Sequence, residues 1–307
     1  MKVSALAGGT GAAKLLRGLA SCLAPEDLTV IGNTGDDTEV WRLHVSPDLD
    51  SVMYALAGVL DRERGWGRVN ETFHCRDAMA AFGAETWFNL GDRDLATHLT
   101  RTAALRAGRS LSDVTLELTR RLGIAGLLLP MSDDPVRTRV RTPEAWLTFQ
   151  EFFVRERARV KVLDVLYEGA EQARPAPRVL AAIADAELII VCPSNPITSI
   201  GPILAVPGIR EALARARARV VAVSPIVGDA AVSGPAGELM RARGLPVSPA
   251  GVASAYAPWL DALVIDAKDA RYVDELATLG IAAVLADIVM TDAHTEVALA
   301  RHVLAAA

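Results

Sequence analysis

Four aspartates on two neighbouring stretches of the chain are the residues best suited to chemistry. Asp36 and Asp37 follow an Asn-Thr-Gly segment, and Asp48 and Asp50 come shortly afterwards. Mg²⁺ in proteins usually takes one or two carboxylates and completes its shell with water and phosphate oxygens. The four side chains therefore predict a magnesium site for a diphosphate. Aspartates at such positions also cap turns and helix starts, and this alternative stays open for Asp36 and Asp48.

A glycine cluster near the N-terminus offers a place for the phosphates. Gly8, Gly9 and Gly11 separate an apolar, strand-like run from a helical segment at Ala12–Ser21. The first turn of a helix has unpaired backbone N–H groups and a positive dipole end, and glycines let a ligand approach the main chain closely. The cluster therefore indicates a phosphate site. A tight strand-to-helix connection that binds nothing is the alternative.

The cluster matches neither of two common nucleotide-binding patterns. A Walker A loop requires Ser or Thr after its lysine, whereas Lys14 is followed by Leu15. The dinucleotide pattern requires a small residue where Lys14 stands, which disfavours ordinary NAD binding. Lys14 itself is either a phosphate contact or a charge on the helix surface.

Two further segments are unusually polar. Residues 193–202 follow an apolar run and present Ser, Asn and Thr side chains between rigid prolines, which suits contact with a nucleotide. Residues 91–94, Gly-Asp-Arg-Asp, open a long helical pattern beside two aromatic residues. There Asp92 would accept a hydroxyl proton and Arg93 would bind an anion, although helix capping explains the same residues.

The elements before these segments predict how they come together. Short apolar runs indicate strands at Lys2–Ala7, Leu28–Ile31, Glu187–Val191, Arg219–Val223, Ala262–Ile265 and Ala282–Ala286. Buried runs that alternate with helical patterns favour a parallel sheet covered on both faces, so the predicted fold is a doubly wound, Rossmann-like α/β sheet. Ligands bind beyond the carboxyl ends of such strands.

The strand–helix rhythm breaks between residues 61 and 175. Longer helical patterns at Leu95–Ala107 and Leu111–Leu122 precede a β-hairpin expected from Val136 to Phe153. We therefore expect a nucleotide-binding core made of residues 1–60 and 176–307. Residues 61–175 are expected to be a mainly helical insertion that forms part of a second-substrate pocket.

Composition excludes several classes of protein. The 307 residues are 51% hydrophobic with a formal net charge of −5, so no basic field exists for nucleic acid. No apolar run reaches the roughly 18 residues of a membrane span, and the first is too short for a signal peptide, which predicts a cytoplasmic enzyme without a membrane partner. Cys22, Cys75 and Cys192 lack metal or disulfide spacing and are expected as buried or half-buried thiols.

Taken together, these residues and several longer motifs resemble one known family. The motifs are Gly8-Gly-Thr-Gly, Asn33-Thr-Gly-Asp-Asp, Pro47-Asp-Leu-Asp-Ser, Arg64-Gly-Trp-Gly, Trp87-Phe-Asn-Leu-Gly-Asp-Arg-Asp-Leu-Ala-Thr-His, Phe149-Gln-Glu-Phe-Phe-Val-Arg and Pro193-Ser-Asn-Pro-Ile-Thr-Ser-Ile-Gly-Pro-Ile-Leu. Over nearly its full length the chain is similar to the 2-phospho-L-lactate transferases of coenzyme F-420 biosynthesis. The resemblance implies transfer of a phospholactyl or phosphoenolpyruvyl group from a guanosine diphospho-ester to the deazaflavin Fo, with release of GMP and with Mg²⁺ as cofactor.

The resemblance also implies roles for individual residues. The metal carboxylates fall on Asp36, Asp37, Asp48 and Asp50, with Asp36 and Asp50 as first choices, and Asp50 or Asp92 is the candidate base for the acceptor hydroxyl. Guanosine diphosphate would lie on Gly8, Gly9, Thr10, Gly11, Ser194, Asn195, Ser199 and Gly201. Lys14 and Asn33 are further candidate ligand contacts, and Asn89, Asp92, Arg93 and His98 would lie nearer the deazaflavin, in the pocket formed in part by residues 61–175.

Two other functions compete with this interpretation. A non-catalytic, nucleotide-sugar-binding regulator of the gluconeogenesis-factor type would have the same fold, but that group lacks the block from Trp87 to Asp94. An NAD-linked oxidoreductase is disfavoured by the missing third small residue. Phospholactate, phosphoenolpyruvate and phosphoglycerate differ by a few atoms, and the residues do not distinguish them. A homodimer is expected because it is the commonest assembly.

Overall fold

The computed structural model describes residues 1–306 of the chain. Its centre is a sheet of seven parallel strands, in the order β14 (Ala282–Ala286), β13 (Ala262–Asp266), β10 (Arg219–Val223), β9 (Leu188–Val191), β1 (Val3–Ala7), β2 (Leu28–Gly32) and β5 (Leu127–Pro130). The central strands are buried along their length, which explains why they appear in the sequence as continuous apolar runs. The six predicted strands are confirmed, with ends that differ by at most one residue.

The direction in which the sheet grows reverses between β1 and β9. From β1 the chain adds β2 and β5 on one side, and then returns to the other side of β1 for β9, β10, β13 and β14. Such a switch point leaves a crevice beyond the carboxyl ends of the two strands. Gly8 follows β1 and Pro193 comes shortly after β9, so two of the predicted polar segments meet at this crevice.

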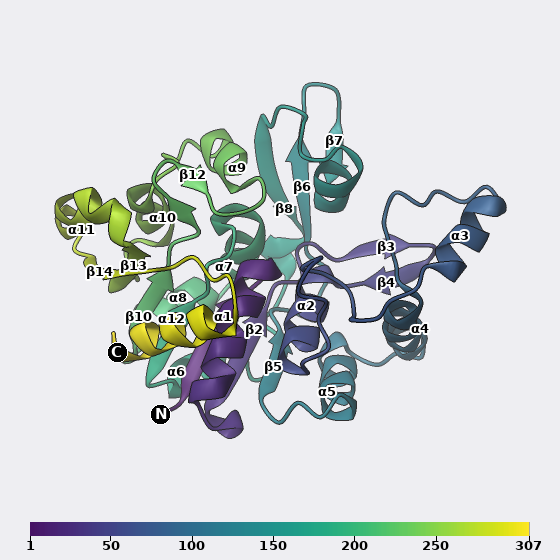
Figure 1. The fold of residues 1–307 in the computed structure, drawn as a ribbon, viewed down its shortest axis with the longest axis horizontal. Helices are drawn as coiled ribbons and strands as arrows, with labels where there is room; N and C mark the ends of the chain where they lie inside the picture. The colour runs from purple at the N-terminus through teal and green to yellow at the C-terminus, as the bar shows by residue number, and fades with distance from the viewer. Residues whose placement is uncertain (307) are drawn as a thin grey trace.

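Helices cover both faces of the sheet, which confirms the predicted doubly wound α/β class (Figure 1). One face packs against α1 (Gly9–Cys22), α2 (Pro47–Leu56), α5 (Leu111–Arg121) and α12 (Ala293–Ala305). The other face packs against α6 (Val179–Asp185), α7 (Gly201–Ala205), α8 (Ile209–Arg215), α9 (Ala236–Ala242), α10 (Pro249–Tyr256) and α11 (Val273–Thr278). The two hydrophobic cores therefore lie on opposite sides of the sheet.

Helix α1 shows how the sequence produces this packing. Leu15, Leu16 and Leu19 recur at helical spacing and are fully buried, so α1 presents one apolar stripe to the sheet. α1 also contacts α2 and α12. A Cβ at Gly18 would overlap the backbone oxygen of Glu296, so glycine at this position permits α1 and α12 to approach so closely.

The segment 61–175 is less separate than predicted. It contributes β5, which pairs with β2 as the edge strand of the main sheet, and α5, which packs on the core. Leu127–Pro130 thus lies in the main sheet although it falls within the range predicted as an insertion, and Leu128 and Leu129 are buried there. Helices α3 (His74–Ala81) and α4 (Asp92–Arg106) of the segment lie on the right of Figure 1.

Three small antiparallel sheets complete the fold. A hairpin of β3 (Thr38–Val40) and β4 (Leu43–Val45) precedes α2, and β11 (Ile226–Val227) pairs with β12 (Ala230–Ala231). The strands β6 (Arg137–Arg141) and β7 (Trp146–Thr148) form the predicted hairpin, and β8 (Asp164–Glu168) joins them at the top of Figure 1. Single helical turns lie at η1 (Pro25–Asp27), η2 (Glu151–Arg155), η3 (Ala170–Gln172), η4 (Pro196–Ile200) and η5 (Ala267–Tyr272).

No single helix within residues 1–306 is both long and apolar enough to cross a membrane. One pair, Pro196–Ala205 with Ile209–Arg215, meets the length and composition requirements only when its two parts are taken together, and these are bent by 89°.

Candidate functional site

A cleft of about 920 Å³ opens at the switch point of the sheet. Its lining combines the turn between β1 and α1, the start of α2, the loop 62–67, part of α4, residues around η2 and the loop after β9. The lining is completed by Asp36, Val45, Phe88, Asn89 and residues 224–225, 232–235 and 288–291. The volume lies near the upper end of the range of small-molecule pockets, about 300–1,000 Å³.

The glycine turn brings three elements together at one end of the cleft. A Cβ at Gly8 would overlap Asp48 Oδ2 of α2 and Cβ of Ser199, and one at Gly11 would overlap the backbone oxygen of Pro193. Ser194 Oγ donates to the Gly8 carbonyl at 2.8 Å. The glycines at positions 8 and 11 are thus required by protein packing, besides leaving the first turn of α1 accessible from the cleft.

Asp36 and Asp48 form a pair of buried carboxylates beside this turn. Asp48 Oδ2 accepts a hydrogen bond from Asn33 Nδ2 at 2.9 Å, and the same amide group donates to the Thr198 carbonyl at 3.0 Å. Burial raises the pKa of Asp48 to about 7, and the charge of Asp37 adds to the rise. Burial, followed by repulsion from Asp48, raises the pKa of Asp36 well above its usual range.

This pair fits a divalent cation. Asp36 Oδ1 is buried and has no hydrogen-bond partner in the structure. Two desolvated carboxylates that repel each other, with an unpartnered oxygen, are what a cation at this place would stabilise. No group of three or more His, Cys, Asp or Glu side chains is placed to hold an ion anywhere in residues 1–306. A cation on this pair would therefore complete its shell with water or phosphate oxygens.

The other two predicted metal ligands have different partners. Asp37 Oδ2 lies 2.9 Å from His44 Nε2 and accepts from Ser46 Oγ at 3.0 Å, and Asp37 does not line the cleft. Both oxygens of Asp50 accept hydrogen bonds from the Arg101 guanidinium. Of the predicted first-choice pair, Asp36 has no ion-pair partner in the part of the chain that the structure describes and Asp50 is paired with Arg101, so Asp36 and Asp48 are the two carboxylates left without a cation. Asp48 and Asp50 both lie in α2, which starts at Pro47. Side chains two positions apart in a helix point about 200° apart around its axis, so the two carboxylates face different sides of α2.

Asp50 belongs to a second polar cluster, on the side of α2 that faces α4. Arg101, His98, Asp94 and Tyr54 are its other members, and all are buried. His98 Nε2 lies 3.2 Å from Asp94 Oδ1, which also accepts from the Tyr54 hydroxyl at 2.6 Å. Burial opposes ionisation of Asp94, but the interaction with His98, the hydrogen bond from Tyr54 and the charge of Arg101 together outweigh this, so the pKa of Asp94 is lowered.

Asp92 and Arg93 lie outside the cleft lining. The Asp92 carboxylate accepts from Thr72 Oγ1 at 2.6 Å and from the backbone N–H groups of His74 and Cys75 at 3.0 Å each. These hydrogen bonds, that of Thr72 first, lower the pKa of Asp92. Asp92 thus accepts hydrogen bonds from the first backbone N–H groups of α3, which have no partner within the helix. The Arg93 side chain is exposed. Neither residue has the position that the predicted catalytic roles require.

The remaining predicted residues divide between the cleft and its surroundings. Gly9, Thr10, Lys14, Asn89, His98, Ser194, Asn195 and Ser199 line the cleft, whereas Asn33 and Gly201 do not. Lys14 Nζ donates to the Met290 carbonyl at 2.9 Å, and Asn195 Oδ1 accepts from two backbone N–H groups at the start of η4. Cys192 is buried and Cys22 half-buried as predicted, but Cys75 is exposed at the start of α3.

The sequence reasoning missed much of the cleft wall. Aromatic side chains line it at Trp66, Phe88, Phe149 and Phe153, and the last two are stacked with ring centroids 5.5 Å apart. The Arg64 guanidinium lies 5.4 Å from the Trp66 ring. Residues 224–225 and 288–291 follow β10 and β14, so the rule on carboxyl ends of strands could have found them.

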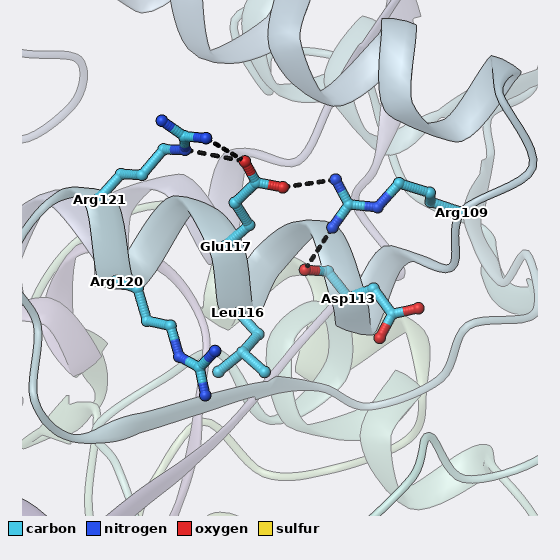
Figure 2. Close-up of a pocket in the computed structure, with 6 residues that line it drawn as sticks. All are labelled: Arg109, Asp113, Leu116, Glu117, Arg120 and Arg121. Atoms are coloured by element: carbon cyan, nitrogen blue, oxygen red, sulfur yellow. Dashed lines mark hydrogen bonds and ion pairs between the residues drawn. The ribbon is translucent and has the colours of Figure 1, made fainter.

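A second, smaller hollow lies on α5 and is separate from the cleft. Figure 2 shows its lining: Arg109, Asp113, Leu116, Glu117, Arg120 and Arg121. Glu117 accepts hydrogen bonds from both Arg109 and Arg121, so acidic and basic groups there neutralise each other. The two hollows share no lining residue.

Comparison with known proteins identifies the family. The model of the family described as 2-phospho-L-lactate transferase CofD matches residues 3–303. The chain belongs to this family. A phosphoenolpyruvate transferase of Streptomyces griseus is 48% identical over 99% of this chain and 98% of its own length. A 2-phospho-L-lactate transferase of Methanosarcina mazei is 46% identical over 97% of this chain and 98% of its own length.

A solved structure agrees on the fold. A member of the upf0052 family from Bacillus halodurans superposes with a TM-score of 0.70 over 99% of this chain and 98% of that one, at 19% identity. This likeness concerns the architecture alone. Membership of the 2-phospho-L-lactate transferase family makes the protein a transferase, as the resemblance implied, in place of the regulator and the oxidoreductase that competed with it.

Proposed function

We propose that the protein transfers a phospholactyl or phosphoenolpyruvyl group from a guanosine diphospho-ester to the terminal hydroxyl of the deazaflavin Fo and releases GMP. Besides family membership, one observation carries the proposal. A single cleft contains the glycine turn, two carboxylates that have no ion-pair partner within residues 1–306, and an aromatic wall. Relatives of nearly equal identity are named for both acids, so identity does not choose between the two.

The donor would lie at the glycine turn. The first turn of α1 faces the cleft with Gly9 and Thr10, and such a helix N-terminus favours phosphate. Lys14 lines the same end and adds a positive charge. Asp36 and Asp48 are the residues that would hold Mg²⁺, which when bound would neutralise the diphosphate and the departing GMP.

The acceptor would lie against the aromatic wall. Trp66, Phe88 and Phe153 present flat apolar surface to the cleft, which suits a planar deazaflavin ring. Asp50 and Asn89 line the cleft as well and offer oxygens to the acceptor's hydroxyl groups. The two clusters on either side of α2 thus correspond to the two substrates.

The reaction needs no protein nucleophile. The terminal hydroxyl oxygen of Fo bonds to the phosphorus that carries the three-carbon acid, and the bond from that phosphorus to the oxygen of GMP breaks. The hydroxyl proton passes to Asp50 or to water, and GMP leaves with the bonding electron pair. Positioning of the two substrates and electrostatic stabilisation supply most of the rate.

Mass spectrometry tests the proposal. The protein is incubated with Fo, MgCl₂ and the guanosine diphospho-ester of lactate, enolpyruvate or glycerate in separate reactions. The expected products are GMP and, in equal amount, Fo extended by the corresponding phospho-acid, and EDTA should abolish their formation. Failure of all three donors to extend Fo would contradict the function. Extension of Fo in the presence of EDTA would contradict the magnesium role alone.

We also propose that the protein is a homodimer, as expected from the frequency of that assembly. Light scattering of the purified protein at several concentrations measures the mass directly. A mass equal to that of one chain at all concentrations would contradict this.

A further inference from the structure

Arg101 stands behind the cleft rather than in it. It projects from α4, its side chain is 1% exposed, and it is absent from the cleft lining. Burial alone would lower the pKa of Arg101, but the Asp50 carboxylate more than offsets this and raises it. The guanidinium is therefore a permanent positive charge in the interior, paired with Asp50 through both terminal nitrogens.

The contacts of Arg101 reach further than Asp50. Its Nη1 donates to Asp50 Oδ2 at 3.0 Å and lies 3.4 Å from His98 Nδ1. Since a guanidinium can only donate, Nδ1 is the acceptor in this contact and the proton of His98 is on Nε2. That nitrogen lies 3.2 Å from Asp94 Oδ1 but outside hydrogen-bond geometry, so the contact between them is electrostatic. Arg101 thus sets the tautomer and the ring orientation of His98.

Four residues of this cluster line the cleft. They are Asp50, Tyr54, Asp94 and His98. Among residues 1–306, Arg101 is the one Arg or Lys side chain that forms an ion pair with an acid of the cluster, whereas Arg68 contacts only the Tyr54 ring. A buried ion pair adds little net stability compared with apolar residues of similar volume. Its location, directly behind polar groups that face a ligand site, indicates a function in ligand orientation.

We propose that Arg101 is a positioning residue of the transfer reaction, which holds Asp50 and His98 in the orientation that receives the acceptor hydroxyl. The inference rests on the proposed function. Asp48 points from α2 toward Gly8 and Asn33 at the donor end, whereas Asp50 points toward α4. Arg101 therefore acts on the acceptor side, and it does so through Asp50 and His98 without touching substrate.

Steady-state kinetics of Arg101→Met and Arg101→Lys test the proposal. We expect kcat to fall about 100-fold in Arg101→Met, because the cleft groups lose their orientation. KM for the guanosine donor should change less than about 3-fold, because the donor end is untouched. Arg101→Lys should recover little of the loss, since an ammonium cannot make two parallel bonds to Asp50. Arg106→Met is the matched control, because Arg106 is exposed on the same helix and donates to the Arg42 carbonyl.

A double variant covers the case in which Arg101→Met does not fold. Removal of one partner leaves the other charge buried and unpaired, whereas Arg101→Met with Asp50→Leu removes both charges. If Arg101 acts through Asp50, the double variant should have the same kcat as Asp50→Leu alone, within about 3-fold. Circular dichroism and a thermal shift on addition of GDP establish that each variant is folded and binds nucleotide.

The outcomes separate the two proposals. Wild-type protein that extends Fo, beside an Arg101→Met variant with unchanged kcat, would overturn the positioning role alone. So would independent, multiplicative losses in the double variant. A change confined to KM for the guanosine donor would mean that Arg101 affects donor binding, and this would also overturn its proposed role on the acceptor side. Wild-type protein that extends Fo with none of the donors would overturn the proposed function and this inference with it.

Discussion

Asp36 and Asp48 illustrate how single residues determine the electrostatics of one end of the cleft. Both carboxylates are buried, and neither has a cationic partner among the ion pairs of the described residues. By contrast, Asp37, which follows Asp36, is paired with His44, and Asp50, two positions after Asp48, is paired with Arg101. The two unpaired carboxylates therefore destabilise the metal-free protein at neutral pH, and a bound cation would relieve the repulsion.

The stability of the metal-free protein should depend on pH through Asp48. Its pKa is about 7 in the folded state against an ordinary value of 3.8, so the folded state binds the proton more tightly than the unfolded state. The resulting stability is fully present below about pH 4 and is lost as the pH rises to about 7, by at most about 4 kcal/mol. Urea denaturation in EDTA at several pH values measures this.

The Asp48→Asn variant is the control for that experiment, because it removes the titrating group while its amide keeps the shape. Part of the loss of stability between pH 4 and 7 should disappear in the variant. Equal pH dependence in the two proteins would show that Asp48 titrates in the ordinary range.

Substitution of Gly8 tests the close contact at the turn. In Gly8→Ala the new Cβ would overlap Asp48 and Ser199, so the free energy of unfolding should fall by about 1–3 kcal/mol and transfer should be largely lost. Gly237→Ala is the matched control, because a Cβ there meets its neighbours at 3.4 Å or more. The control should stay within about 0.5 kcal/mol of wild type. Equal stability and activity of the two variants would refute the packing argument.

At the scale of elements, α2 separates the two ends of the cleft. Helix α3, in turn, needs a residue outside the helix to bind its first backbone N–H groups. Asp48 and Asp50 leave α2 on different sides, toward β1 and toward α4 respectively. Helix α3 has no buried residue, and its first N–H groups are bound by Asp92 at the start of α4. Asp92 thus ties two helices together instead of serving the cleft.

The Asp92→Ala variant should therefore loosen α3 without stopping the reaction. We expect a loss of about 1 kcal/mol, as for removal of a helix cap, and faster hydrogen exchange across residues 74–81. The rate of transfer should stay within about 3-fold of wild type. Asp77→Ala, an exposed acid on α3 itself, is the control. A large loss of kcat with unchanged exchange would restore the catalytic role first predicted for Asp92.

At the scale of the whole molecule, the sheet joins both halves of the chain. β5 comes from the segment that the sequence suggested was an insertion, yet it pairs with β2 through Leu128. We expect Leu128→Ala to cost about 2–5 kcal/mol, measured by urea denaturation, because the side chain is buried in the core. Leu166→Ala on the half-exposed β8 should cost less than about 1 kcal/mol. Similar costs would mean that β5 is peripheral.

The sequence predicted what depends on local pattern and missed what depends on distant partners. Six of the seven strands of the main sheet were predictable because each is a short apolar run between helical patterns, whereas β5 was missed because it lies within the segment interpreted as an insertion. The β3–β4 hairpin was missed because Trp41 and Arg42 occupy its turn with φ of 51° and 62°, where Asn or Gly is the usual sign. The pairing of Asp50 with Arg101 spans 51 positions and leaves no pattern in the spacing of residues.

The bond from Lys14 to the Met290 carbonyl joins the first helix to a loop near the end of the chain. Both residues line the cleft, so segments that are 276 positions apart in the chain close the same side of it. A partly folded chain in which β14 and residues 288–291 have not yet joined the sheet would therefore have a cleft that is open on this side.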